Sequence, residues 1–228
     1  MRDCQSANQQ IEIAGSRSKV RSGGPIGDPA IRIETKALNR VLAYNPRDLT
    51  ISVEAGMRYA DLTAILVEKK QFLPIEAPFS NDATIGGILA THSSGHRRRL
   101  FGTVRDLVIG MQFATLQGRI VQSGGMVVKN VAGLDFAKIL TGSFGTLACI
   151  ATVNFKLMPA PSGARTFLFQ NVSIAEVFAK RNDILKSVLQ RVHSVAGRRL
   201  TVLAHAVDLA HFRVGAADPD RILALGYA

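Results

Sequence analysis

The chain has 228 residues and a formal charge of +11, from 28 Lys and Arg against 17 Asp and Glu. Its hydrophobic share of 47% and charged share of 20% are those of a folded protein with a substantial core, which excludes disorder as the main state. The longest stretch without a charged side chain, residues 139–155, contains Gly, Ser and Asn and is shorter than the ~20 apolar residues of a membrane helix, so no transmembrane segment is expected.

Apolar and polar residues alternate in three short segments of the first part of the chain. Residues 11–13, 31–34 and 50–55 have the period of half-buried strands. The spacing of Leu62, Ile65 and Leu66 predicts a helix over residues 59–70, with its lysines at the C-terminal end, where cations are favoured. Two prolines, at positions 74 and 78, close this first α/β portion.

The second portion continues to residue 160, and glycines and prolines mark the boundaries of four further elements. We expect a short helix after Asn81 with Asp82 or Thr84 as its cap, a hairpin of residues 107–116 and 120–123, a helix over 134–140 and a strand over 147–157. Beyond Pro161, apolar residues between Ile174 and Val192 fit one face of a long helix, and the remainder has the character of a tail or an incomplete domain.

The loop after the first predicted strand has a composition suited to an anion. Gly15-Ser16-Arg17-Ser18-Lys19 offers consecutive backbone N–H groups, two hydroxyls and two cations, the combination that a pyrophosphate requires. A plain solvated turn accounts for the same residues. The chain has neither a Walker A loop nor a G-x-G-x-x-G fingerprint, so nucleotide binding of the P-loop or Rossmann type is disfavoured.

Two adjacent glycines, Gly86 and Gly87, open the predicted helix after Thr84. Each costs about 1 kcal/mol relative to Ala in a helix, so a compensating interaction is expected. Small residues allow a flat ring or a phosphate to approach the backbone, and they equally allow close packing against a neighbouring strand. A third glycine-bearing segment, Lys129–Asp135 leading into Thr141–Leu147, follows later in the chain.

The excess of basic residues is spread along the chain, and Arg97–Arg99 is its one run. Because no zinc-finger spacing, RNP-type motif or basic zipper accompanies that run, we expect no nucleic-acid binding; an anionic cofactor or an acidic partner accounts for the charge. His92 and His96, beside the same run, face either solvent or an anionic substrate.

No metal site is expected either. Cys4 and Cys149 lack zinc-ligand spacing, and the histidines after residue 161 are too far apart for a helical pair; they are His193, His205 and His211. The polar first ten residues and the two cysteines indicate a reducing, cytoplasmic setting.

Taken in order, these segments resemble the FAD-binding domain of the vanillyl-alcohol oxidase type, also called the PCMH type, over about residues 11–160. Within that family the chain is similar to the FAD-binding E-type subunits of bacterial glycolate oxidases. The motifs that carry the resemblance are Gly15–Lys19, Thr50–Leu62, Ala83–Ala90, Phe101–Asp106, Lys129–Asp135 and Gly142–Ile150. The resemblance implies an α+β fold of two α/β subdomains, about residues 1–76 and 77–160, with FAD in the crevice between them. It leaves residues 161–228 as a short, incomplete cap-like region.

The resemblance also implies which residues contact FAD. Backbone amides of the Gly15–Lys19 loop would hold the pyrophosphate, Gly145 would permit close approach, and the Ile150 backbone would reach the cofactor from the last strand. The remaining expected contacts follow the flavin side and are Pro78, Thr84, Ile85, Gly86, Gly87, Ser93, Ser94, Gly95 and Thr103.

The sequence departs from the family pattern at two places that bear on the site. Covalent members attach flavin through a histidine after Arg-Ser-Gly-Gly, but here Arg21–Gly24 is followed by Pro25, so FAD is expected to be non-covalent. Phe144 and Ala148 stand where relatives that oxidise 2-hydroxy acids usually have Glu and Gly.

The function implied is that of the FAD-binding subunit of a 2-hydroxy-acid (glycolate) oxidase or dehydrogenase complex. FAD would accept a hydride from the substrate and pass electrons to a second flavoprotein subunit and an iron–sulfur subunit. These partners would place the chain peripherally at the inner membrane. The short cap and the lack of an evident general base predict that the chain is inactive alone. The alternative is a flavin-free or truncated scaffold subunit; a reductase of the N-acetylmuramate pathway is disfavoured because its substrate domain is not evident.

Overall fold

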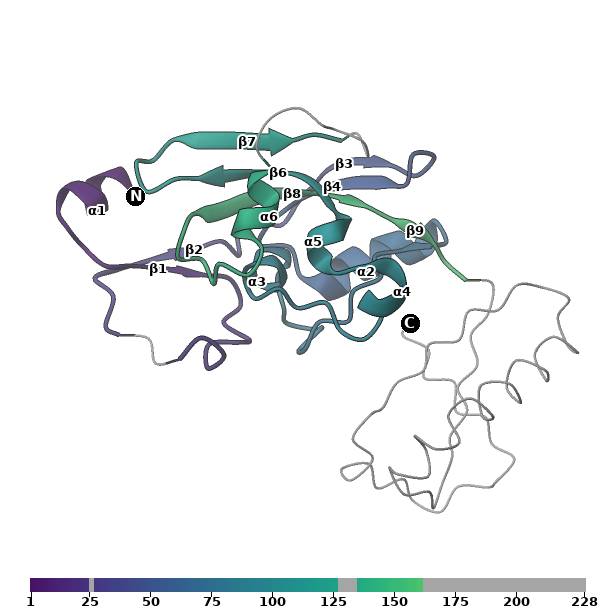
Figure 1. Ribbon diagram of the computed structural model, residues 1–228, viewed down its shortest axis with the longest axis horizontal. Coiled ribbons are helices and arrows are strands. Elements are labelled where there is room, and N and C mark those ends of the chain that lie inside the picture. Colours follow the sequence, from purple (N-terminus) through teal and green to yellow (C-terminus); the bar gives the residue numbers. More distant parts are fainter. Residues whose placement is uncertain (25–26, 127–134, 162–228) are drawn as a thin grey trace, which may run out of the picture. The chain divides into compact units, whose positions relative to one another are not determined.

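A five-stranded antiparallel sheet forms the centre of the structure, a computed structural model that describes residues 1–24, 27–126 and 135–161 (Figure 1). Its strand order is β3-β4-β8-β6-β7, and two small sheets, the parallel pair β1–β2 and the antiparallel pair β5–β9, lie outside it. The strands are β1 (Ile11–Ala14), β2 (Ile31–Glu34), β3 (Val41–Asn45), β4 (Thr50–Glu54), β5 (Gln71–Phe72), β6 (Val108–Ala114), β7 (Ile120–Gly124), β8 (Cys149–Lys156) and β9 (Met158–Pro159).

Helices cover one face of the central sheet: α3 and α5 pack on β8 and β6, and α6 packs on β6 and β7 (Figure 1). The predicted helix from residue 59 ends at Glu68, where the backbone turns at Lys69. The helices are α1 (Arg2–Ser6), α2 (Tyr59–Glu68), α3 (Ile85–Ala90), α4 (Arg98–Phe101), α5 (Val104–Leu107) and α6 (Phe136–Leu140).

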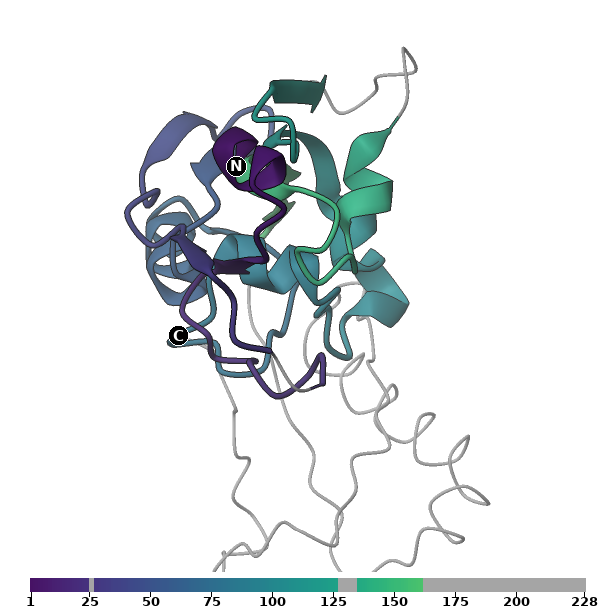
Figure 2. The same ribbon diagram turned by 90° about the vertical axis from the view of Figure 1, so that its left-hand side faces the viewer.

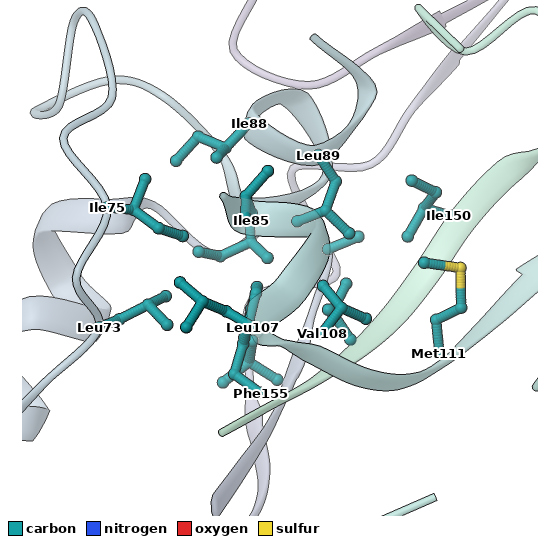
Figure 3. Close-up of a cluster of buried hydrophobic side chains, with 14 of the residues drawn as sticks. Leu73, Ile75, Ile85, Ile88, Leu89, Leu107, Val108, Met111, Ile150 and Phe155 are labelled. Atoms are coloured by element: carbon teal, nitrogen blue, oxygen red, sulfur yellow. The ribbon is translucent and has the colours of Figure 1, made fainter. Parts of the chain in front are cut away.

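One hydrophobic core lies between α3 and the sheet. Ile85 and Ile88 of α3 are fully buried, as is Phe155 of β8. Each fully buried aliphatic or aromatic side chain contributes roughly 1.5–3 kcal/mol, so this layer fixes the position of α3 relative to the strands. Figure 3 shows the labelled side chains of this cluster, which are Leu73, Ile75, Ile85, Ile88, Leu89, Leu107, Val108, Met111, Ile150 and Phe155.

The strand β4 is buried on both faces, although its alternating sequence predicts a half-buried strand. It lies between β3 and β8, and all five of its residues are buried, the polar ones included. Glu54, only 4% exposed, accepts hydrogen bonds from Arg40: 2.8 Å from its backbone N–H and 2.8 Å from its guanidinium. These bonds to Arg40 lower the pKa of Glu54, which therefore stays charged although it is buried.

Several elements were not expected from the sequence, and two of these differences bear on the central sheet. The edge strand β3 was not predicted, because Val41–Asn45 lacks regular alternation and presents Leu42 to solvent. The strand predicted from residue 107 instead begins at Val108, after the helical turn α5. That turn forms because the Asp106 carboxylate accepts hydrogen bonds from the Thr103 backbone N–H and hydroxyl, both at 2.8 Å, as a helix N-terminus requires.

The central sheet joins segments from both sides of residue 76. β3 and β4 precede that residue and pair with each other, and β4 also pairs with β8, which follows it. β1 and β2 pair only with each other among the described strands. The division into subdomains at residue 76 stays a prediction. The chain divides into units 1–160 and 161–228; the second unit, with the helix predicted between Ile174 and Val192, lies outside the described residues except for Pro161. None of the helices in the described residues has the length and apolar character to cross a membrane.

Gly56, just beyond β4, is expected to tolerate no side chain. A Cβ there would lie 1.8 Å from the carbonyl oxygen of Thr35 and 2.7 Å from that of Leu38, and both are backbone atoms. We expect Gly56→Ala to lower the free energy of unfolding by about 2 kcal/mol or more, measured by urea denaturation. Gly125→Ala is the control, since a Cβ there meets no described atom within 4 Å. Equal stability of the two variants would show that the Gly56 contact does not exist in solution.

Candidate cofactor site

The loop from Gly15 to Lys19 leaves β1 and passes the start of α3. A Cβ at Gly15 would lie 2.3 Å from the Thr84 hydroxyl oxygen, so only Gly permits this approach. In the loop, Arg17 has a positive φ of 58°, and the Ser16 hydroxyl donates to the Ser18 hydroxyl at 3.3 Å. The structure therefore brings the predicted pyrophosphate loop and the predicted glycine helix together, side by side. Figure 2 shows β1 and β2 in purple beside the teal helices.

The two cations of this loop have different surroundings. The Arg17 guanidinium lies 3.2 Å from the carboxylate of Glu12, which also pairs with Arg32 at 2.6 Å. The Lys19 ammonium, in contrast, is buried and has no hydrogen-bond partner among the described residues. Burial lowers the pKa of Lys19, because desolvation disfavours the charged form. An unpaired buried cation is costly, so an anion is the partner that this position calls for.

The sequence left two interpretations open for the glycines of α3, close packing against a strand and close approach of a ligand. The structure favours a different one for each glycine. A Cβ at Gly86 would lie 3.1 Å from both the Cβ and the carbonyl oxygen of Ala55, to which the Gly86 N–H donates at 2.7 Å. Gly86 thus packs against the end of β4. A Cβ at Gly87 would meet only the Thr84 hydroxyl, at 3.1 Å, among the described atoms within 4 Å. Thr84 is the helix cap, its side chain accepting from the Gly87 N–H, so the Gly87 face is the one left open for a ligand.

A third loop, Gly142–Leu147, is attached to the other end of α3. The N–H groups of Gly142 and Phe144 donate to the carbonyls of Leu89 and Ala90 at 2.9 and 2.8 Å. A Cβ at Gly145 would lie 3.7 Å from Ile13 of β1, so this loop also lies beside the first one. The Ser143 hydroxyl is buried without a hydrogen-bond partner in the part of the chain described here. Ser143 is a candidate ligand contact that the sequence did not single out.

The segment Ser93–Gly95 is held in place mainly by protein contacts. The Ser93 hydroxyl shares a hydrogen bond of 2.7 Å with Thr91, and the buried Ser94 hydroxyl accepts from the Val104 N–H at 3.0 Å. Gly95 has a positive φ of 70°, and a Cβ there would lie 2.6 Å from the Glu76 carbonyl oxygen. The family resemblance implies that these residues lie on the flavin side. In the structure, the hydroxyls of Ser93 and Ser94 hydrogen-bond to neighbouring protein groups and so hold the backbone that follows α3.

Glu76 anchors the basic segment after Gly95. Its side chain is 9% exposed and its carboxylate lies 2.6 Å from His96 Nδ1 and 3.1 Å from the Arg97 guanidinium. It also accepts from the backbone N–H groups of both residues. No sequence signal indicates this role, because a single glutamate between two prolines is not distinctive.

Three further predicted contacts have varied surroundings. Thr103 donates its hydroxyl to Asp106, and hydrogen bonds from Thr103 hold the pKa of that carboxyl below its usual value. Pro78 is exposed in the turn before Thr84. The side chain of Ile150 is buried in the core (Figure 3). In β8, the residues that pair with β4 are Thr152 to Lys156, so Ile150 lies just before the paired stretch. Pro25, residues 129–134 and the three C-terminal histidines lie outside the described residues.

The converging loops fit a pyrophosphate-linked dinucleotide such as FAD. Lys19 supplies a buried cation without a partner, and Gly87 leaves the first turn of α3 open. The three segments that the resemblance assigns to FAD are in contact through Thr84, Ile13 and the last turn of α3, although they are far apart in sequence. The residues present therefore match the chemistry of the group.

Comparison with protein families agrees with this geometry. Residues 1–124 match the model of a family described as an FAD binding domain. The chain is 32% identical over 171 residues to the glycolate oxidase subunit GlcE of Escherichia coli strain K12, covering 75% of this chain and 48% of that protein. It is 29% identical over 174 residues to the glycolate oxidase subunit GlcD of Bacillus subtilis strain 168, covering 75% of this chain and 37% of that protein.

A further relative is the D-2-hydroxyglutarate dehydrogenase of Xanthomonas citri, 27% identical over 199 residues, covering 86% of this chain and 42% of that protein. A solved structure of alkyldihydroxyacetonephosphate synthase superposes with a TM-score of 0.66 at 24% identity, covering 82% of this chain and 34% of that one, which confirms the predicted α+β fold of the PCMH type. The chain spans about half the length, or less, of the curated relatives that it matches.

Proposed function

This chain belongs to the family of FAD binding domains and its cofactor is FAD, and we propose that it binds FAD non-covalently as a subunit of a 2-hydroxy-acid oxidase or dehydrogenase. The observation that carries the proposal is the buried Lys19 ammonium, without a partner in the described residues, at the loop beside α3. Pro25 supports non-covalent binding, because proline has no nucleophilic side chain at the place where covalent members have histidine.

The residues of the three loops have distinct tasks in this proposal. When bound, FAD supplies the two-electron chemistry that the protein side chains lack. Lys19 and the backbone N–H groups after Gly15 hold the pyrophosphate, and Gly87 leaves room for the cofactor over the first turn of α3. Ser143 offers a hydroxyl whose hydrogen bond is unused within the described residues.

We further propose glycolate or a similar 2-hydroxy acid as the substrate, and other glycolate oxidase subunits, a second flavoprotein and an iron–sulfur subunit, as the partners. Two of the relatives are glycolate oxidase subunits, which supports the substrate and a complex of several subunits, whereas the iron–sulfur subunit is proposed from the family resemblance alone. The charge of +11 favours association with acidic partner surfaces, with an affinity that falls as salt rises. A cytoplasmic location, with attachment to the inner membrane through the partners, stays a prediction.

The test is reconstitution of the purified chain with FAD. We expect flavin absorbance in the protein fraction after gel filtration, and complete release of that flavin into solution on denaturation in guanidinium. FMN lacks the pyrophosphate bridge and is expected to bind much more weakly. Flavin that stays on the unfolded polypeptide would contradict non-covalent binding. A folded protein that takes up no FAD would contradict the proposal and favour the flavin-free scaffold.

The substrate is tested on the same reconstituted protein under anaerobic conditions. Glycolate, D-lactate and D-2-hydroxyglutarate are added in turn, with and without co-purified partner subunits, and the loss of flavin absorbance that accompanies reduction is followed. We expect reduction by one of these acids in the presence of the partners. Bound flavin that none of them reduces in the complex would contradict the assignment to 2-hydroxy acids.

A further inference from the structure

Two features of Phe144, its backbone conformation and its exposure to solvent, are unfavourable for the stability of the folded chain. Its backbone has a positive φ of 53°, a left-handed conformation that bulky residues rarely adopt. The residue is 51% exposed, so a large part of this apolar residue gains nothing from burial. A residue that is unfavourable both in its backbone and in its exposure points to a role outside the fold.

The surrounding backbone holds Phe144 in this conformation. Its N–H donates to the carbonyl of Ala90 at 2.8 Å, and the N–H of Gly142 donates to that of Leu89 at 2.9 Å. Both flanking glycines, Gly142 and Gly145, also have positive φ, of 89° and 77°. The loop is therefore attached to the last turn of α3, and the attachment fixes the direction in which the phenyl ring projects.

The ring of Phe144 lies against the segment that carries Lys19. A Cβ at Gly23 would be 3.3 Å from Cδ1 of the ring, so the absence of a side chain at Gly23 leaves room for it. Gly23 directly follows a turn that is closed by a hydrogen bond of 3.0 Å from the Ser22 N–H to the Lys19 carbonyl. The partly exposed aromatic ring and the unpaired buried cation are thus joined through one short turn.

We propose that Phe144 provides the surface on which the adenine ring of FAD stacks; this inference rests on the proposed function. In FAD the pyrophosphate joins the adenosine to the flavin half. With the pyrophosphate at Lys19 and the flavin half over Gly87, as proposed above, the adenine is the ring left for the turn that carries Gly23. An exposed phenyl ring next to that turn offers a face for stacking, an interaction that aromatic side chains make with any base. The isoalloxazine lies at the opposite end of the cofactor.

The proposal is tested with the full chain by calorimetric titration of FAD, ADP and FMN against Phe144→Leu. Leucine keeps the Cβ and an apolar side chain but has no aromatic face. We expect the affinities for FAD and ADP to fall by about tenfold or more, and the affinity for FMN to stay unchanged. Phe79→Leu is the matched control, because Phe79 also has a positive φ, of 57°, and is 62% exposed, but precedes the opposite end of α3. We expect no change in ADP affinity there.

Phe144→Gly separates stacking from a structural role. Glycine removes the left-handed strain, so we expect the melting temperature of the apoprotein to be unchanged or higher while the affinity for ADP falls. A lower melting temperature with unchanged ADP affinity would assign the ring to packing and overturn the proposal. If the affinities for FAD and FMN fall equally, the isoalloxazine and not the adenine stacks on Phe144, which would also overturn the proposal. If the wild-type chain binds no FAD, the proposed function fails too, whereas normal binding by Phe144→Leu rejects the stacking alone.

Discussion

Replacing Lys19 with methionine is expected to lower the affinity for FAD by about 10- to 100-fold, since a charge-assisted hydrogen bond in a partly buried site contributes about 1.5–3 kcal/mol. The same change is expected to leave the apoprotein as stable as before or more stable. Its ammonium is desolvated and has no partner in the described residues, so removing it relieves an unfavourable burial. Fluorescence titration with FAD and thermal unfolding of the apoprotein measure the two effects separately.

Lys36→Met is the matched control for this experiment. Lys36 is exposed just after β2, so the substitution removes one positive charge without altering the loop. We expect its effect on FAD affinity to stay within about twofold at moderate salt, where exposed charges are screened. If Lys19→Met and Lys36→Met weaken FAD binding equally, the effect comes from net charge and the specific role of Lys19 is rejected.

The lowered pKa of Lys19 also gives FAD binding a predictable dependence on pH. At pH values below that pKa, the lysine is protonated with or without FAD, so this group makes the FAD affinity independent of pH there. As the pH rises through it, the apoprotein loses the proton while the bound pyrophosphate favours keeping it, so the affinity falls by up to about tenfold per pH unit. Between the lowered pKa and the ordinary lysine value, the unfolded chain binds more protons than the folded apoprotein. The stability of the apoprotein therefore rises with pH in that interval.

Gly87→Val is expected to abolish FAD binding, by more than about 100-fold in affinity, while lowering stability by no more than about 1 kcal/mol. A Cβ at Gly87 meets only the hydroxyl of Thr84 within 4 Å in the described structure, at 3.1 Å, so a shift of this side chain by a few tenths of an ångström admits it. The added methyl groups would occupy the open face of α3, where we place the cofactor. The measurements are FAD titration and urea denaturation of the apoprotein.

The neighbouring substitution, Gly86→Val, serves as the comparison. Its Cβ would lie 3.1 Å from the Ala55 carbonyl oxygen, a backbone atom that also accepts the Gly86 N–H bond. We expect a loss of about 1–3 kcal/mol of stability whether or not FAD is present. Normal FAD affinity in folded Gly87→Val protein would show that the cofactor does not cross this turn, and would leave close packing as the explanation for both glycines.

The fold was largely predictable because its main strands and helices have clear periodicity. The segments at residues 11–14, 50–54 and 59–68 formed where alternation or helical spacing indicated them. The hairpin closed at Gly118, whose φ of 71° explains the turn. The edge strand β3 and the turn α5 were missed because their formation depends on partners elsewhere: β4 for the first, and the Thr103–Asp106 cap for the second.

The candidate site was predictable as a set of segments but not as a set of contacts. Residue types single out the loop of Gly15 and Lys19 and the glycines of α3, and the family resemblance assigns both to FAD. Neither shows that Glu12 lies 3.2 Å from Arg17 while Lys19 has no partner among the described residues, because such contacts depend on how the chain folds. The pairing of β1 with β2 brings Arg32 to Glu12 as well. In the sequence, Phe144 is only a departure from the family pattern. Its exposure and left-handed backbone become visible in three dimensions.

The position of β8 in the sheet sets the order in which the chain can fold during synthesis. β8 is inserted between β4 and β6, yet it leaves the ribosome after both of them, about 100 residues later than β4. Until residue 156 emerges, β4 and β6 each have an unpaired inner edge in the central sheet, and such edges favour association with other chains. Nascent chains arrested before β8 should therefore depend on chaperones, and the site between the loops should assemble only when this strand closes the sheet.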